Sequence, residues 1–291
     1  MTAIRLASPP KHERWPGARM RQFSTSPGEM ARSLWRNRDL ILQLTRREVI
    51  GRYRGSMFGL VWSFFNPLLM LGVYTLVFGV VFNARWRTDH SSQGEFALIL
   101  FAGLLVFNVF SECISRAPGL VLANPNYVKK VVFPLEVLPW VTVGSALFHA
   151  AVSFIVWLGF YILVFGAPHA TMLMFPLVLA NLVLIVLGLS WILASLGVYV
   201  RDIGQLVAVM IPALLFLSPI FYPLSALPEA WRILVYLNPM TLIVEQARDV
   251  MIWGEIATWK SLAVATAMAV TTAWLGFAWF QRTRRGFADV I

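Results

Sequence analysis

Cysteine is nearly absent from this chain, and charged residues are scarce. The one cysteine, Cys113, excludes an intrachain disulfide and a cysteine metal cluster. Charged residues make up 13% of the sequence and apolar residues 58%, against roughly 25% and 45–50% in soluble domains. A globule of 291 residues cannot enclose so much apolar surface. We therefore expect a single domain whose outer surface faces lipid.

Common catalytic motifs are also missing. The sequence contains no G-x-x-x-x-G-K-[ST] loop for the phosphates of ATP, no G-x-S-x-G and no H-E-x-x-H. The first 28 residues carry no apolar run, so we expect no cleavable signal peptide. These absences predict a membrane protein that is not an enzyme and has no cofactor of its own. Its energy would then come from a partner.

Six apolar segments are long enough to span a membrane, which takes about 20 residues. The predicted fold class is therefore an all-α integral membrane protein with six transmembrane helices. The fifth segment is the shortest and contains Pro212, with Pro219 near its end, so we expect a kink or a half-helix there. The six predicted spans lie near residues 57–82, 96–117, 138–165, 172–199, 205–223 and 260–281.

The distribution of basic residues predicts the orientation of the spans. If the N-terminus is cytoplasmic, the inner segments hold nineteen Lys and Arg residues and the outer segments hold five. Cytoplasmic loops carry such an excess, so both termini are predicted to be cytoplasmic. Basic residues beside an anionic leaflet also explain the net charge of +10, without a nucleic-acid partner.

Residues 29–50 predict a basic amphipathic helix lying on the cytoplasmic membrane surface. Its apolar residues fall within an arc of about 80° at helical spacing; they are Met30, Leu34, Ile41 and Leu44. The alternative is a surface helix packed on a soluble core, but this chain offers no such core. Residues 1–28 before it are predicted to be a flexible tail.

The segment 51–56 brings Arg52 and Arg54 to the cytoplasmic end of the first span. A guanidinium group can bind a phosphate through two parallel hydrogen bonds. We therefore predict an entrance site for a phosphate headgroup at Arg47, Arg52 and Arg54. The alternative is a general anchor to lipid headgroups.

A short cytoplasmic helix is predicted at residues 125–133. Asn124 suits the cap, Pro125 suits the first turn, and Pro134 stops the helix. The segment is too apolar for a plain solvated turn, which indicates that it docks a partner. Together with the tight inner connection near residue 201, the predicted docking residues are Asn126, Tyr127, Val128, Lys129, Lys130, Phe133, Arg201 and Asp202.

Polar residues within the spans are functional candidates by default. Asn66-Pro67 is expected to break the first span, while Glu112 and His149 are each expected to make an interhelical hydrogen bond. Aromatic faces can stack on sugar rings, so a subset of the aromatic and polar residues could line a passage. The candidates are Trp62, Tyr74, Phe107, Asn108 and Ser111.

The outer segment 224–259 is long and only half polar. Pro228, Pro239 and Gly254 divide it into two pieces of short-helix length. Such pieces suit the membrane interface or a re-entrant position.

Several motifs resemble the permease subunit of polysaccharide exporters of the type-2 ABC class. The most specific are TRREVIGRYRGSMFGLVWSFFNPLLMLGVYTLVFGVVF (45–82) and NPNYVKKVVFPLEVLP (124–139). YVRDIGQ (199–205), SPIFYP (218–223), LNPMT (237–241) and RTRRGFADVI (282–291) agree, and the last favours the O-antigen branch. The resemblance covers about residues 29–291.

The resemblance implies a homodimer in a bacterial inner membrane, with two separate ATP-binding subunits that bind ATP and Mg. Residues 125–133 would be the coupling helix, which transmits ATP-driven closure to the spans. Short periplasmic gate helices would occupy 224–259. The substrate would be a polysaccharide on undecaprenyl diphosphate, moved from the cytoplasm to the periplasm.

Other readings remain open at this level. One is export of capsule or teichoic-acid chains, and another is export of drugs or small lipids by the same architecture. A different class would be a structural or assembly protein of the membrane with no transport activity.

Overall fold

The computed structural model describes residues 24–82, 86, 93–129, 133–256 and 258–291. Within these ranges the chain is helical and has no strand. The main helices are α1 (Pro27–Arg36), α2 (Arg38–Tyr53), α3 (Val61–Tyr74), α4 (Gln93–Arg116), α5 (Pro125–Lys129), α6 (Leu138–Phe165), α7 (Phe175–Tyr199), α8 (Ile203–Leu217), α9 (Glu229–Leu237), α10 (Pro239–Arg248), α11 (Trp259–Thr283) and α12 (Phe287–Val290).

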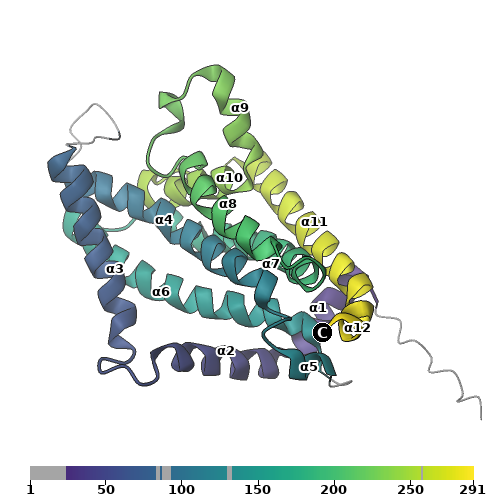
Figure 1. The fold of residues 1–291 in the computed structure, drawn as a ribbon. Coiled ribbons are helices and arrows are strands. Elements are labelled where there is room, and N and C mark those ends of the chain that lie inside the picture. The colour runs from purple at the N-terminus through teal and green to yellow at the C-terminus, as the bar shows by residue number, and fades with distance from the viewer. Residues whose placement is uncertain (1–23, 83–85, 87–92, 130–132, 257) are drawn as a thin grey trace, which may run out of the picture.

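The long helices form a bundle around α4 (Figure 1). In the apolar stretch of α4, 83% of the residues are buried, against 17% in the stretch Val61–Val81 that contains α3. The mostly apolar surface of α3 therefore faces lipid or another protein. One end of the bundle carries α2, α5 and α12, and the other carries α9; we call these the α5 end and the α9 end (Figure 1).

Small residues let α7 and α11 approach closely, as is common between helices in membranes. A Cβ atom on Gly188 would collide with the carbonyl of Thr272, and one on Gly276 would collide with the carbonyl of Gly188. Ala269 and Ala273 lie fully buried on the same face of α11. Among the described helices, α7 and α11 therefore form the most extensive helix–helix contact.

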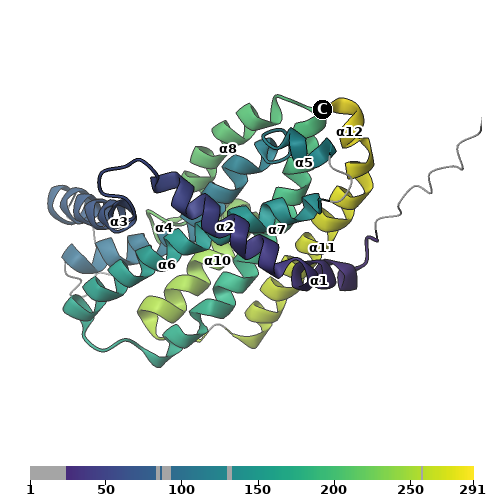
Figure 2. The same cartoon turned by 90° about the horizontal axis from the view of Figure 1, so that it is seen from below.

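The predicted surface helix lies across the α5 end, at a large angle to the spans (Figures 1 and 2). It differs from the expectation for residues 29–50, because Asn37 separates α1 from α2. The amide of Asn37 donates to the carbonyl of Ser33 at 2.8 Å, a local bond that competes with helix continuation. Helix α2 packs on α6, where Gly144 leaves room for Thr45. Helix α1 begins at Pro27, inside the predicted tail 1–28, of which residues 1–23 lie outside the described residues.

The break expected at Asn66-Pro67 is not observed. Helix α3 runs through Pro67 and continues as a π-helix over Thr75–Val81, where the hydroxyl of Thr75 donates to the carbonyl of Leu71 at 2.8 Å. Spanning helices tolerate proline where neighbouring groups satisfy the freed carbonyls. The chain therefore leaves the α-helical pattern at Thr75, directly after α3, and not at Pro67.

Five helices in the described part of the chain are long and apolar enough to cross a membrane, and α8 is shorter, with 15 residues. At 1.5 Å per residue, α8 covers about 22 Å of a core about 30 Å thick. It leads from the α5 end towards α10, and α1 and α12 both lie at the α5 end (Figure 1). Two ends on one side require an even number of crossings, so this placement favours the predicted sixth span.

The outer segment contains two short helices, α9 and α10, followed by a π-helix over Asp249–Trp253. The two helices begin after Pro228 and at Pro239, and the π-helix ends at Gly254, whose φ of 68° favours glycine. The amide oxygen of Asn238 accepts from the backbone N–H of Met240 at 3.0 Å and caps α10.

A buried arginine fixes this segment to the bundle. Arg248 is 1% exposed, and its guanidinium donates to the carbonyls of Pro219, Ile220 (2.7 Å) and Ile99 (3.3 Å). It also pairs with Glu245 at 3.2 Å and lies 4.3 Å from the ring centre of Trp86. Burial lowers the pKa of Arg248 to about 10, while Glu245 partly offsets this effect. One side chain therefore joins α4, α10 and the chain after α8.

We predict that Arg248→Lys destabilises the protein by about 2–4 kcal/mol, because lysine lacks the planar fork that meets several carbonyls at once. Thermal unfolding of the purified protein in detergent measures the loss. Arg232→Lys is the matched control, since Arg232 donates only to the carbonyl of Leu227 among the contacts shown for it. Equal unfolding temperatures for the two variants would contradict the role of Arg248.

Candidate functional site

A polar pocket opens between the C-terminal end of α2 and helices α3, α4 and α6. It measures about 450 Å³, and four of the five predicted passage residues line it: Trp62, Tyr74, Asn108 and Ser111. Arg52 reaches the same pocket from the last turn of α2. We call it the entrance pocket. The fifth passage candidate, Phe107, is only 2% exposed and packs against Phe110, so it belongs to the core.

Glu112 of α4 is the centre of the charges in the entrance pocket. Its carboxylate pairs with Nη2 of Arg52 at 2.5 Å and lies 3.2 Å from Nδ1 of His149 on α6. Nη1 of Arg52 lies 3.0 Å from the same ring nitrogen. Glu112 and His149, which were expected to act separately, therefore form one cluster with Arg52. The sequence did not indicate this partnership.

The cluster continues to the C-terminal end of α4. Arg116 pairs with Glu48 of α2 at 2.5 Å and lies 3.7 Å from Glu112, one turn away on its own helix. Two carboxylates and two guanidinium groups thus balance one another between α2 and α4. From the sequence, Arg116 counted only among the nineteen basic residues of the inner segments.

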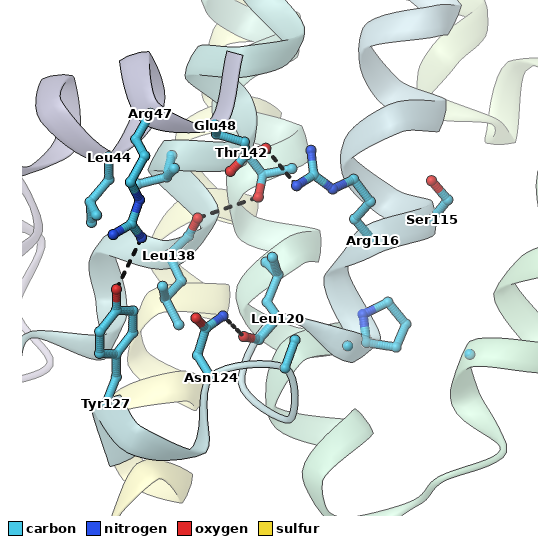
Figure 3. Close-up of a pocket in the computed structure, with 15 residues that line it drawn as sticks. Leu44, Arg47, Glu48, Ser115, Arg116, Leu120, Asn124, Tyr127, Leu138 and Thr142 are labelled. Atoms are coloured by element: carbon cyan, nitrogen blue, oxygen red, sulfur yellow. Dashed lines mark hydrogen bonds and ion pairs between the residues drawn. The ribbon is translucent and has the colours of Figure 1, made fainter. Parts of the chain in front are cut away.

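A second pocket, of about 510 Å³, lies between α2 and the segment that leads into α5 (Figure 3). Nη2 of Arg47 donates to the hydroxyl of Tyr127 across it at 3.1 Å. The Arg116–Glu48 pair lies on its far side (Figure 3). Arg47 therefore contacts the predicted docking helix, whereas Arg52 faces the entrance pocket. Arg54 is exposed just after α2.

The predicted docking helix is shorter than expected. Helix α5 covers Pro125–Lys129, and residues 130–132, which include Lys130, lie outside the described residues. The side-chain amide of Asn124 donates to the carbonyl of Leu120 at 2.9 Å, and its backbone carbonyl accepts from the N–H of Tyr127 at 3.0 Å.

An aromatic stack joins α5 to Phe133. We call α5 and residues 133–136 the docking segment, after their predicted role. The rings of Tyr127 and Phe133 lie parallel with their centres 4.1 Å apart. Both residues, with Val128, are half-buried and pack against the core, while Asn126 is exposed. The turn that carries Arg201 and Asp202 is also exposed. The apolar residues of the segment therefore face the bundle, and Asn126, Arg201 and Asp202 are exposed.

Glu136, a residue missed by the sequence analysis, anchors the docking segment to three helices. Its carboxylate pairs with Arg284 at 2.6 Å and accepts from the hydroxyl of Ser33 at 3.1 Å. Its backbone carbonyl accepts from the indole of Trp191 at 3.1 Å. A carboxylate two residues after the proline stop Pro134, at the entry to an apolar span, was the available signal. The described residues contain no group of three or more metal-ligating side chains.

Comparisons with known proteins agree with this geometry. The model of the ABC-2 type transporter family matches residues 39–252. An O-antigen export system permease protein, RfbA of Myxococcus xanthus, is 28% identical over 264 residues, which are 90% of this chain and 99% of that protein. An RfbA of Klebsiella pneumoniae is 24% identical over 254 residues, 87% of this chain and 95% of that protein. The polysialic acid transport protein KpsM of Escherichia coli is 26% identical over 245 residues, 82% and 90% of the two chains.

The family match covers well over half of the chain, and these relatives match it over nearly their whole length. The family resemblance read from the sequence motifs is thereby confirmed. The helical bundle with its apolar exterior fits a multi-pass membrane subunit. The chain belongs to the ABC-2 type transporter family, as a permease subunit and thus a transporter component rather than an enzyme.

Proposed function

We propose that this permease exports a polysaccharide of the O-antigen type, carried on undecaprenyl diphosphate, from the cytoplasm to the periplasm. The observation that carries the proposal is the match to an O-antigen export permease over 90% of this chain and 99% of that relative. The working unit is a homodimer with two ATP-binding subunits that bind ATP and Mg. Its place is the bacterial inner membrane, with both termini in the cytoplasm.

The entrance pocket supports a lipid-diphosphate substrate. Arg52 and Arg54 stand at the α5 end of α3, where a headgroup in the inner leaflet would arrive. Behind Arg52, Trp62 and Tyr74 offer aromatic faces, and Asn108 and Ser111 offer hydrogen bonds. This combination suits a sugar joined to a phosphate, since rings stack on aromatic faces and guanidinium groups bind phosphate.

The docking segment supports energy supply by a separate subunit. Helix α5 and the turn at Arg201 and Asp202 lie exposed at one end of the bundle. Arg47 ties α5 to α2, and Glu136 ties the same segment to the C-terminal region through Arg284. A push on α5 would therefore reach the helix that carries Arg52.

Capsule export is the second candidate function, because the polysialic acid transport protein KpsM also matches 82% of this chain. Deletion of the gene distinguishes the two. Under the proposal, O-antigen disappears from the cell surface and its lipid-linked polymer accumulates in the cytoplasm, while capsule is unchanged. A plasmid copy restores export. Loss of capsule with normal O-antigen would reject the O-antigen assignment and favour the second candidate.

Replacing both Arg52 and Arg54 by alanine should lower export at least tenfold, because each charge-assisted contact to phosphate contributes about 1.5–3 kcal/mol. The double lysine variant, Arg52→Lys with Arg54→Lys, should restore export only in part, since lysine lacks the planar fork. Surface polymer is measured at equal membrane level of the permease. Arg46→Ala, at an exposed arginine of the same helix, is the control. Full activity of the double lysine variant would leave only a general anchoring role.

Replacing Tyr127 and Phe133 by alanine should reduce co-purification of the ATP-binding subunit about five- to tenfold. The aromatic stack that shapes the segment is lost, and such a pair contributes about 0.5–1.5 kcal/mol beyond its buried area. Tyr127→Phe keeps the stack and removes only the bond to Arg47, so it should retain the partner. Undiminished co-purification with the double alanine variant would count against this docking site.

A further inference from the structure

The arginine that faces the entrance pocket is already occupied by a carboxylate of the same chain. Resting on the proposed function, we propose that Glu112 is a specificity-determining residue: it holds Arg52 until a headgroup with more than one negative charge displaces it. Bulk anionic phospholipids carry one charge on a phosphodiester. The pair would therefore keep the site closed to them while admitting a lipid diphosphate.

The pair is placed where exchange is possible. Arg52 lies in the last turn of α2, and its side chain is 40% exposed, whereas the side chain of Glu112 is 19% exposed on α4. Their atoms meet at 2.5 Å on the wall of the entrance pocket. The chain after α2 contains Gly55 and Gly59, with φ of 85° and 50°. The arginine is thus the accessible partner and the carboxylate the enclosed one.

Two other side chains lie close enough to stabilise the Glu112 carboxylate once Arg52 binds a ligand. Nη1 of Arg116 lies 3.7 Å from the carboxylate and has no hydrogen-bond partner among the described residues, although it is buried. His149 keeps its ring nitrogen 3.2 Å from the other carboxylate oxygen. Displacement would therefore leave Glu112 paired, which avoids the high cost of an isolated buried charge.

The charges decide which ligand gains from the exchange. A phosphodiester replaces one negative charge by another, so it gains little over Glu112 and must also be stripped of water. A diphosphate carries a charge on each phosphate group, so it can bind Arg52 with one charge and offer the other to Arg54, two residues further along the chain. Competition by Glu112 therefore gives specificity by weakening the binding of phosphodiesters more than the binding of diphosphates.

The test measures binding of farnesyl diphosphate to the purified permease with its ATP-binding subunit in lipid nanodiscs. In neutral phosphatidylcholine discs, Glu112→Gln should bind the diphosphate about tenfold more tightly than the unaltered protein. In discs that also contain phosphatidylglycerol, the variant should lose most of that gain, because the phosphodiester now competes for Arg52. The unaltered protein should change little between the two discs.

Asp39→Asn is the matched control, because it removes one carboxylate from an exposed position on the same helix as Arg52. It should bind like the unaltered protein in both discs. If Glu112→Gln is not recovered in folded form, Glu112→Asp keeps the charge but shortens the side chain, and phosphatidylglycerol should again compete. Equal binding by the recovered Glu112 variant and the unaltered protein in both discs overturns the inference.

Arg52→Gln separates this inference from the proposed function. One outcome is that Arg52→Gln loses diphosphate binding while the Glu112 variant behaves like the unaltered protein. That result would support the entrance site at Arg52 and reject only the role of Glu112 as a competitor. If Arg52→Gln binds diphosphate normally, the entrance assignment of the proposed function falls as well.

Discussion

An ionised side chain inside a membrane bundle is costly unless an opposite charge or several hydrogen bonds meet it. The described part of this chain meets that requirement with three clusters, centred on Arg248, Glu112 and Glu136. Each cluster joins helices that are far apart in the sequence. The apolar helices can slide and tilt against lipid at little cost, but these polar contacts fix their relative positions. The bundle is therefore held at its two ends and at its entrance.

The Glu112 cluster and the docking segment both contact the surface helix α2. One side of α2 presents Arg47 to Tyr127 of the docking segment, and the next residue, Glu48, holds Arg116 beside Glu112. One turn further on, Arg52 reaches the entrance pocket. Because α2 also packs along α6, its position depends on both the docking segment and that long helix. A short stretch of one helix thus contacts both the docking segment and the entrance pocket.

Local chemistry in the sequence was enough to predict the helical membrane fold and the places of the short outer helices, since apolar length and proline positions act on their own neighbourhood. It was not enough for the breaks at Asn37 or after Tyr74, where a side-chain bond and a π-helix decide. It also grouped Trp62, Tyr74, Asn108 and Ser111 as passage candidates without showing why Phe107 differs. The ion pairs between distant helices escaped prediction because their partners lie 60 to 148 residues apart, and the spacing of charges along the chain does not show which of them meet. These pairs are Arg52–Glu112, Glu48–Arg116 and Glu136–Arg284.

The pair formed by Glu136 and Arg284 has a consequence for synthesis. The ribosome makes Glu136 first and must add 148 further residues before its cation exists, which takes roughly 7–30 s at about 5–20 residues per second. During that interval the carboxylate lacks the guanidinium of Arg284 and, among the described residues, has only the hydroxyl of Ser33 as its earlier-made partner. The contacts of Glu136 are therefore complete only after the last long helix, α11, has been synthesised.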